Sequence, residues 1–198
     1  MLWVLVASGG AAGVLTLAAS YRELIRHWWW LAAVVGSLTA FSGSCAETMG
    51  GAVLSAVVAG LLVVQTPLDV RTRHVSRRAT VIAVALVSAV IAMDVVGDGV
   101  GVRSAVVAVG VAAVVVATYA LLHRLSPRSL GWGDVLLVAP LGLAIGYVAA
   151  DRVVVWQLLA STTGAIHALA LRRLRGVRTI PFGPHLLVAA WLVLLASV

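Results

Sequence analysis

The sequence predicts an all-α fold: a polytopic transmembrane helix bundle of about eight spans with both termini outside. Hydrophobic residues make up 62% of the 198 residues and charged residues only 11%, which is typical of a multi-span membrane protein and not of a soluble domain. Backbone groups in lipid must be satisfied internally, so the apolar segments are predicted to be helices. They run roughly over 2–19, 28–43, 49–66, 79–96, 102–122, 134–150, 153–171 and 182–197.

The segments divide the chain into two parts. Residues 1–48 form a predicted N-terminal two-span segment with a minimal cytoplasmic loop, and residues 49–198 form a six-span core. The first segment lacks the basic region and cleavage site of a secretory signal, so it is expected to be a retained span. The second begins with Trp28-Trp29-Trp30, which is typical of interfacial anchoring.

The arginines orient the helices. The chain contains no lysine, and its +7 formal charge comes from arginine alone. Alternating spans place twelve arginines in the loops on one side and only Arg103 and Arg152 on the other. The arginine-rich side is therefore predicted to be cytoplasmic, in a multi-pass protein of the plasma (inner) membrane. We attribute the basic charge to this topology and to arginines that contact anionic lipid headgroups, and not to nucleic-acid binding.

Two of the seven acidic residues stand out. Five are expected to be solvated, interfacial or locally paired: Glu23, Glu47, Asp94, Asp98 and Asp151. Asp69 and Asp134 both fall at predicted cytoplasmic helix ends, where a retained carboxylate usually serves a function. By position alone, Asp69 could instead pair with Arg71 or Arg73, and Asp134 could be a first-turn acid favoured by the helix dipole.

A glycine-rich motif surrounds the second aspartate. Gly131-Trp132-Gly133-Asp134 opens a predicted helix, and glycines permit close backbone approach and torsions that other residues avoid. A stripe of small residues then follows about a quarter turn around the helix, which allows another helix to pack closely. Its members are Ala139, Gly142 and Gly146.

These residues resemble the signature of the type IV prepilin peptidases, membrane aspartyl proteases of the Gly-x-Gly-Asp type. Asp69, after an apolar helix and before a short polar loop, matches the family's first catalytic aspartate, and Asp134 matches the second. A third match resembles the opening of the family's last helix: Pro181, Phe182, Gly183 and Pro184, preceded by Ile180. The resemblance spans roughly residues 49–198, with the motifs in the family's order.

The resemblance implies a membrane-embedded aspartic endopeptidase that cleaves the basic leader from pilin-like precursors at the cytoplasmic membrane boundary. One carboxylate would take a proton from water while its neutral partner donates to the scissile carbonyl, with no fixed assignment of roles. Neither metal nor organic cofactor is implied, and the sequence has no cysteine cluster or His-Glu-x-x-His. The expected partners are pilin-like precursors and membrane lipids, with no nucleic acid; no oligomeric state is predicted.

The chain departs from the family pattern in three places. Val75-Ser76 stands where the family usually has Ile-Pro, and Leu136 where it often has lysine. The connection 21–27 is too short for the cysteine-bearing cytoplasmic domain that methylates the new amino terminus in many bacterial members. We therefore predict peptidase activity without methyltransferase activity.

Two other functions stay open at this point. One is a catalytically inactive family member that assists pilus or secretion-filament assembly. The other is a small proton-coupled transporter, which would place its acids nearer the bilayer midplane. Among the remaining polar residues, His167 is expected to form a neutral interhelical hydrogen bond, and His185 is a candidate to approach the aspartates. His74 and His123 are expected to be solvated, and Cys45 to be an inert thiol.

Overall fold

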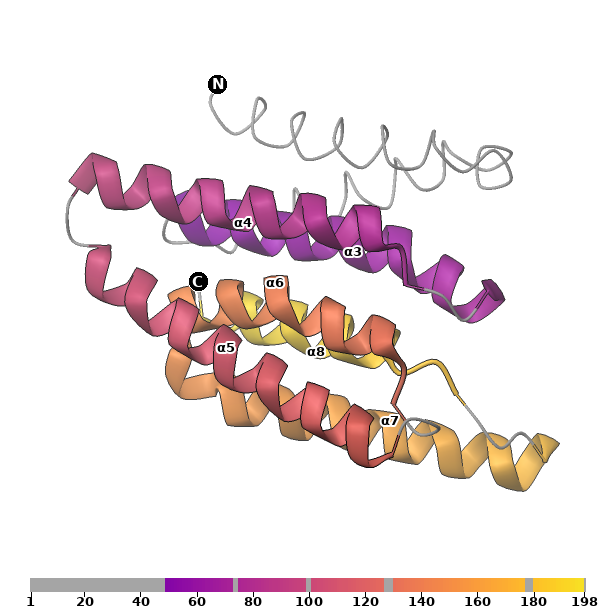
Figure 1. The fold of residues 1–198 in the computed structure, drawn as a ribbon. Coiled ribbons are helices and arrows are strands. Elements are labelled where there is room, and N and C mark those ends of the chain that lie inside the picture. The colour runs from indigo at the N-terminus through magenta and orange to yellow at the C-terminus, as the bar shows by residue number, and fades with distance from the viewer. Residues whose placement is uncertain (1–48, 73–74, 99–100, 127–129, 177–179, 198) are drawn as a thin grey trace, which may run out of the picture.

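The computed structural model describes residues 49–72, 75–98, 101–126, 130–176 and 180–197. Within these ranges the chain is helical and contains no strand, which confirms the predicted all-α class. Segments 2–19 and 28–43, with their connection, lie outside the described residues. The elements are α3 (Met49–Thr72), α4 (Arg77–Asp98), α5 (Val102–Leu125), α6 (Trp132–Val148), the short 3-10 helix η2 (Ala150–Arg152), α7 (Val153–Arg175) and α8 (Gly183–Leu195) (Figure 1).

The described helices suit a membrane. Three stretches are long and apolar enough to cross a bilayer: Arg77–Gly97, Val102–Leu125 and Ala150–Leu174. Shorter apolar stretches occupy the other three helices, at Gly50–Val63, Trp132–Val148 and Gly183–Leu195. The chain is accordingly a helical membrane protein, while the number of spans and the sides of the termini stay predictions.

Every described α-helix except α8 extends beyond its predicted segment at one end or both, and two of these extensions concern the motif residues. Helix α3 continues to Thr72, so Asp69 lies on its last turns and not in a loop after it. Helix α6 begins at Trp132, two residues before the predicted start. A hydropathy pattern stops at the first polar residues, whereas helical backbone hydrogen bonding runs on through them.

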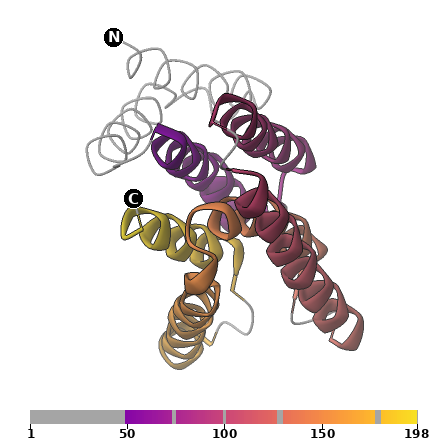
Figure 2. The same cartoon turned by 90° about the vertical axis from the view of Figure 1, so that its left-hand side faces the viewer.

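Helix α6 is central, because it contacts each of the other five described α-helices. Figure 2 looks along the bundle and shows α6 among the others. Its closest neighbour is α5: a β-carbon on Gly146 would lie 2.8 Å from the Ala108 Cα, and one on Gly142 would lie 3.0 Å from the Ala112 Cα. At these two positions the stripe packs against another helix as predicted, and the alanines of α5 supply the facing surface.

Adding a methyl group at Gly146 is expected to weaken this contact. In Gly146→Ala the new carbon would meet both the Ala108 backbone and the Val111 Cβ, at 2.8 and 2.9 Å. Overpacking of this kind costs about 1–3 kcal/mol, so the thermal unfolding midpoint in detergent should fall. Gly110→Ala is the matched control, because a β-carbon on that helical glycine meets nothing within 4 Å. Equal midpoints for the two variants would contradict the close α5–α6 contact.

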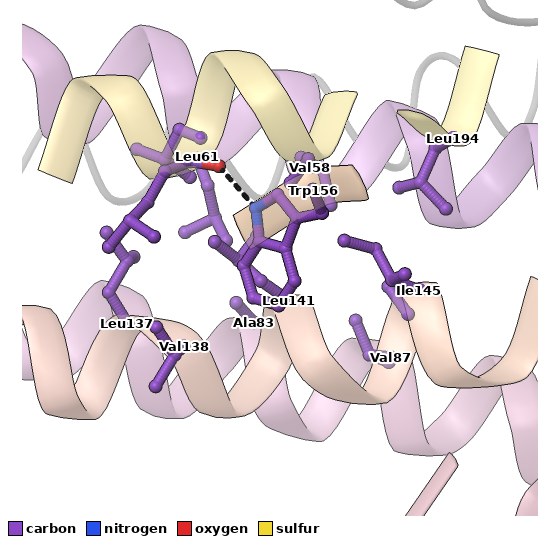
Figure 3. Packing of buried hydrophobic residues seen from close by; sticks show 14 of the residues in the cluster. Val58, Leu61, Ala83, Val87, Leu137, Val138, Leu141, Ile145, Trp156 and Leu194 are labelled. Atoms are coloured by element: carbon purple, nitrogen blue, oxygen red, sulfur yellow. Dashed lines mark hydrogen bonds between the residues drawn. The ribbon is translucent and has the colours of Figure 1, made fainter. Parts of the chain in front are cut away.

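A buried tryptophan joins the other side of α6 to α7 and α8. Trp156 of α7 is fully buried, and its indole N–H donates to the Leu186 carbonyl oxygen of α8 at 3.0 Å (Figure 3). Leu141 of α6 and Val58 of α3 belong to the same apolar cluster. This shared interior fixes the relative positions of α3, α6 and α8, whose ends carry the three motifs.

The opposite end of the bundle holds an interhelical polar contact. The Tyr147 hydroxyl of α6 donates to the Asp94 carboxylate of α4. Asp94 is half-buried and is tied to a neighbouring helix by this hydrogen bond, a contact that the sequence did not indicate.

Candidate active site

The two aspartates face the same backbone position. Asp69 comes from the C-terminal part of α3, Asp134 from the first turn of α6, and Gly183 is the first residue of α8. A β-carbon placed on Gly183 would lie 2.8 Å from Asp69 Oδ2 and 3.5 Å from Asp134 Oδ1. The distance between Asp69 Oδ2 and Asp134 Oδ1 therefore cannot exceed the sum of these two distances. Both carboxyl groups belong to buried residues, exposed by only 6% and 8%.

The Gly-x-Gly-Asp segment aims the Asp134 carboxyl group. The Gly131 N–H donates to Asp134 Oδ2 at 3.3 Å, and the Asp134 N–H donates to the Gly131 carbonyl at 3.1 Å. This reciprocal cap uses Oδ2, so Oδ1 is the oxygen that faces Gly183. The Asp134 carboxylate also lies in the first turn of α6, where the helix dipole favours negative charge. Asp134 is therefore both the first-turn acid considered from the sequence and a member of the pair of acids.

The motif glycines act through contact and not through unusual torsions. Gly131 has φ −71° and ψ 146°, an extended conformation open to any residue. A β-carbon on Gly133, however, would lie 2.7 Å from the Val75 Cβ and 2.8 Å from its Cγ2. The expectation of special torsions was wrong here, since the only described glycine with positive φ is Gly176. Gly133 instead lets the segment after Asp69 touch the turn before Asp134.

The last motif brings α8 to the acids. Phe182 precedes the helix, and its carbonyl accepts the N–H groups of His185 at 3.0 Å and Leu186 at 3.3 Å. Its ring lies against α7, where a β-carbon on Gly164 would be 2.8 Å from the Phe182 Cε2. Pro181 lies just before this anchor, and Pro184 occupies the first turn of α8. The segment thereby presents the Gly183 backbone to both carboxyl groups.

Other predicted support residues lie around this core. Ala139 and Leu136 are half-buried on α6. Arg73 and His74 lie outside the described residues, as does Cys45, and the described part does not include the Arg71 side chain. The alternative pairing of Asp69 with Arg71 or Arg73 therefore falls outside the described part of the chain.

His123 is a residue that the sequence interpretation missed. Its Nδ1 lies 2.8 Å from the Leu130 carbonyl oxygen, and since a carbonyl only accepts, Nδ1 carries the proton in this contact. The His123 ring also lies 5.3 Å, between centroids, from the Trp132 ring. His123 thus holds the residues that flank Gly131, and the expectation that it is solvated was wrong. No local sequence pattern marks a histidine that bonds a carbonyl seven residues later.

The other two described histidines contact each other. His167 Nδ1 of α7 and His185 Nε2 of α8 lie 3.0 Å apart, so one ring donates to the other. This agrees with the interhelical hydrogen bond expected for His167. His185 also lies beside the Phe182 ring, with centroids 6.4 Å apart.

A buried pair of carboxyl groups at one end of a helical membrane bundle is a candidate site for acid–base chemistry. Comparison with known families agrees with it: the model of the type IV leader peptidase family matches residues 56–169, which include both aspartates. The chain belongs to this family.

Curated relatives extend the likeness over a shorter region. The prepilin leader peptidase/N-methyltransferase of Aeromonas salmonicida (strain A449) is 41% identical over 71 residues, which cover 34% of this chain and 23% of the relative. The proteins of that name from Aeromonas hydrophila and Pseudomonas aeruginosa are 39% identical over 71 residues, with the same coverage. The match thus spans less than a quarter of these relatives. No solved structure matches the chain.

Proposed function

We propose that this protein is a membrane-embedded aspartic endopeptidase that removes the basic leader from pilin-like precursors at the cytoplasmic membrane boundary. One observation carries the proposal: Asp69 Oδ2 and Asp134 Oδ1 converge on the Gly183 backbone inside the bundle. Membership of the type IV leader peptidase family supports the reaction class, and the names of the curated relatives support prepilins as substrates.

The geometry suits activation of one water molecule by two carboxyl groups. Two carboxylates this close repel each other, so the site favours a state with a single shared proton. The ionised member takes a proton from water as the water oxygen bonds to the scissile carbonyl carbon, while the neutral member donates to the carbonyl oxygen. The carbon–nitrogen bond then breaks and a proton passes to the departing amine. The roles of Asp69 and Asp134 belong to the pair.

The Gly131 N–H limits the motion of one member. By holding Asp134 Oδ2 it keeps Oδ1 directed at Gly183, which lowers the reorganisation needed when water is deprotonated. Gly183 itself, having no side chain, leaves room beside both acids for an extended peptide backbone. The transporter alternative is disfavoured by position, because the acids lie on terminal turns of α3 and α6 and not halfway along them.

The proposal includes peptidase activity without methylation and an active site on the cytoplasmic side of the plasma membrane. The short connection 21–27 and the twelve-to-two arginine split support these two points. Lipid headgroups are proposed to contact the arginine-rich loops.

The test is co-expression with a pilin-like precursor encoded in the same genome, followed by mass analysis of the precursor's amino terminus. We expect loss of the leader and an unmethylated new terminus. An intact precursor, in cells where the protein is folded in the membrane and a known family peptidase cuts the same precursor, would overturn the peptidase proposal. A methylated terminus would overturn the proposed lack of methyltransferase activity.

A further inference from the structure

A buried glutamine lies one helical turn before Asp69. Gln65 is 1% exposed, and its side-chain amide bonds both backbone groups of Ser76, eleven residues along the chain. Gln65 Nε2 donates to the Ser76 carbonyl at 3.1 Å, and the Ser76 N–H donates to Gln65 Oε1 at 2.9 Å. Burial of an amide is unfavourable unless it is hydrogen-bonded. The pair of bonds therefore closes the segment that follows Asp69 back onto α3.

Ser76 also starts the next helix. Its Oγ accepts the Ala79 N–H at 3.3 Å, and its carbonyl accepts the Thr80 N–H at 3.0 Å and the Thr80 hydroxyl at 3.1 Å. The Ser76 N–H is left for Gln65, and a proline at position 76 has no such donor. Gln65 and Ser76 thus form one hydrogen-bonded unit. Serine in place of the family's usual proline at position 76 supplies the N–H that this unit needs.

This unit reaches the second aspartate through the contact between Val75 and Gly133. Val75, held by the bonds at Ser76, lies against Gly133, where a β-carbon would meet its side chain at 2.7 Å and its backbone nitrogen at 3.4 Å. Gly133 immediately precedes Asp134. A continuous path of contacts therefore runs from α3, through Gln65 and the 75–76 segment, to the first turn of α6.

We propose that Gln65 is a positioning residue that sets the separation of Asp69 and Asp134. The Gln65 amide fixes where Val75 sits, and Val75 fixes how closely the Gly131–Asp134 turn approaches α3. Gln65 acts through the 75–76 segment and not on the substrate. The activity part of this inference rests on the proposed peptidase function, while its geometric part does not.

The geometric test measures the separation of the two acid positions by cross-linking. Asp69→Cys and Asp134→Cys are combined in a Cys45→Ala background, and a short bifunctional thiol reagent is applied to the folded protein in membranes. Adding Gln65→Met, which keeps the volume of the side chain but loses both hydrogen bonds, should lower the cross-linked fraction several-fold. Ser55→Ala is the matched control: Ser55 is a fully buried polar residue of α3 whose hydrogen bond, to the Ala52 carbonyl, stays within that helix.

An unchanged cross-linked fraction in Gln65→Met would overturn the positioning role. If Gln65→Met does not accumulate in folded form, Gln65→Glu replaces it in the same experiment. When it is protonated, its carboxyl can accept from the Ser76 N–H and donate to the Ser76 carbonyl, so at a pH low enough to keep it protonated, cross-linking equal to that of the parent protein is expected. A several-fold loss with Gln65→Glu would then contradict the role assigned to these two bonds.

The activity test separates positioning from substrate contact. Gln65→Met in the otherwise unaltered protein should lower kcat about 10- to 100-fold, the scale of a small misplacement of reacting groups, with KM nearly unchanged. Gln65→Glu should recover most of the rate. Reduced cross-linking together with no cleavage even by the unaltered protein would reject the peptidase function but keep the positioning role. Normal cleavage and normal cross-linking in Gln65→Met would reject the positioning role alone.

Discussion

Asp69→Asn and Asp134→Asn are each expected to leave the pilin-like precursor uncut, with the single-turnover cleavage rate at least about 10³-fold below that of the unaltered protein. Asparagine has nearly the same shape as aspartate but cannot take a proton from water. The fold should persist, because the substitution removes a buried charge beside another acid, and in Asp134→Asn the new amide oxygen can still accept the Gly131 N–H. Cleavage is measured in isolated membranes by the mass of the precursor.

Asp151→Asn supplies the control, since Asp151 is an exposed acid on η2, away from the pair; its cleavage rate should equal that of the unaltered protein. The double variant should be no slower than either single one, because members of one catalytic unit are strongly non-additive. Near-normal cleavage by Asp134→Asn would show that the reaction does not depend on the pair of Asp69 and Asp134. A filament phenotype that survives both substitutions would favour the inactive assembly factor instead.

The helices themselves were predictable because apolar runs of spanning length have few other structures available in lipid. Each of the six apolar segments after residue 48 corresponds to one observed helix. Their ends were not predictable from hydropathy: the last turns of α3 include Asp69 and the first turn of α6 includes Trp132. Both acids therefore lie on helical turns, and Asp69 lies three residues beyond the predicted end of its apolar segment at residue 66.

The glycine motifs were predictable as places of close approach, but their partners were not. Gly146 meets Ala108 and Gly133 meets Val75, and a sequence rich in alanine and valine contains no pattern that selects those partners. The convergence of Asp69 and Asp134 on Gly183 depends equally on the packing of three helices far apart in the chain. The residue types of the candidate site could be predicted from their motifs, whereas the distances between them depend on tertiary packing.

Side-chain bonds to distant backbone groups were the least predictable feature. His123 bonds the carbonyl of Leu130, and Gln65 bonds both backbone groups of Ser76. Each contact closes a connection between helices, so it exists only once the helices are packed. In the sequence, His123 is one more polar residue near a helix end, which is why it was interpreted as solvated.

Gly183→Ala is expected to lower the cleavage rate about 10²-fold while the protein keeps its fold. The added methyl group would lie 2.8 Å from Asp69 Oδ2 and 3.5 Å from both Asp134 Oδ1 and Leu137 Cδ2. The nearest atom is the end of a carboxylate, so relief comes from turning the Asp69 side chain and not from moving a helix. The measurement pairs the single-turnover rate with the thermal unfolding midpoint in detergent.

Gly97→Ala is the control for this comparison, because a β-carbon on that helical glycine meets no atom within 4 Å; its rate and midpoint should stay near those of the unaltered protein. A rate loss in Gly183→Ala at an unchanged midpoint would tie the effect to the acids. A full cleavage rate in Gly183→Ala would mean that neither carboxyl group needs its present position. The convergence of the two acids on Gly183 would then no longer support the proposed function. Loss of the rate together with a large fall in the midpoint would assign Gly183 to packing against Leu137, and the convergence of the acids would then be a consequence of helix packing without a catalytic role.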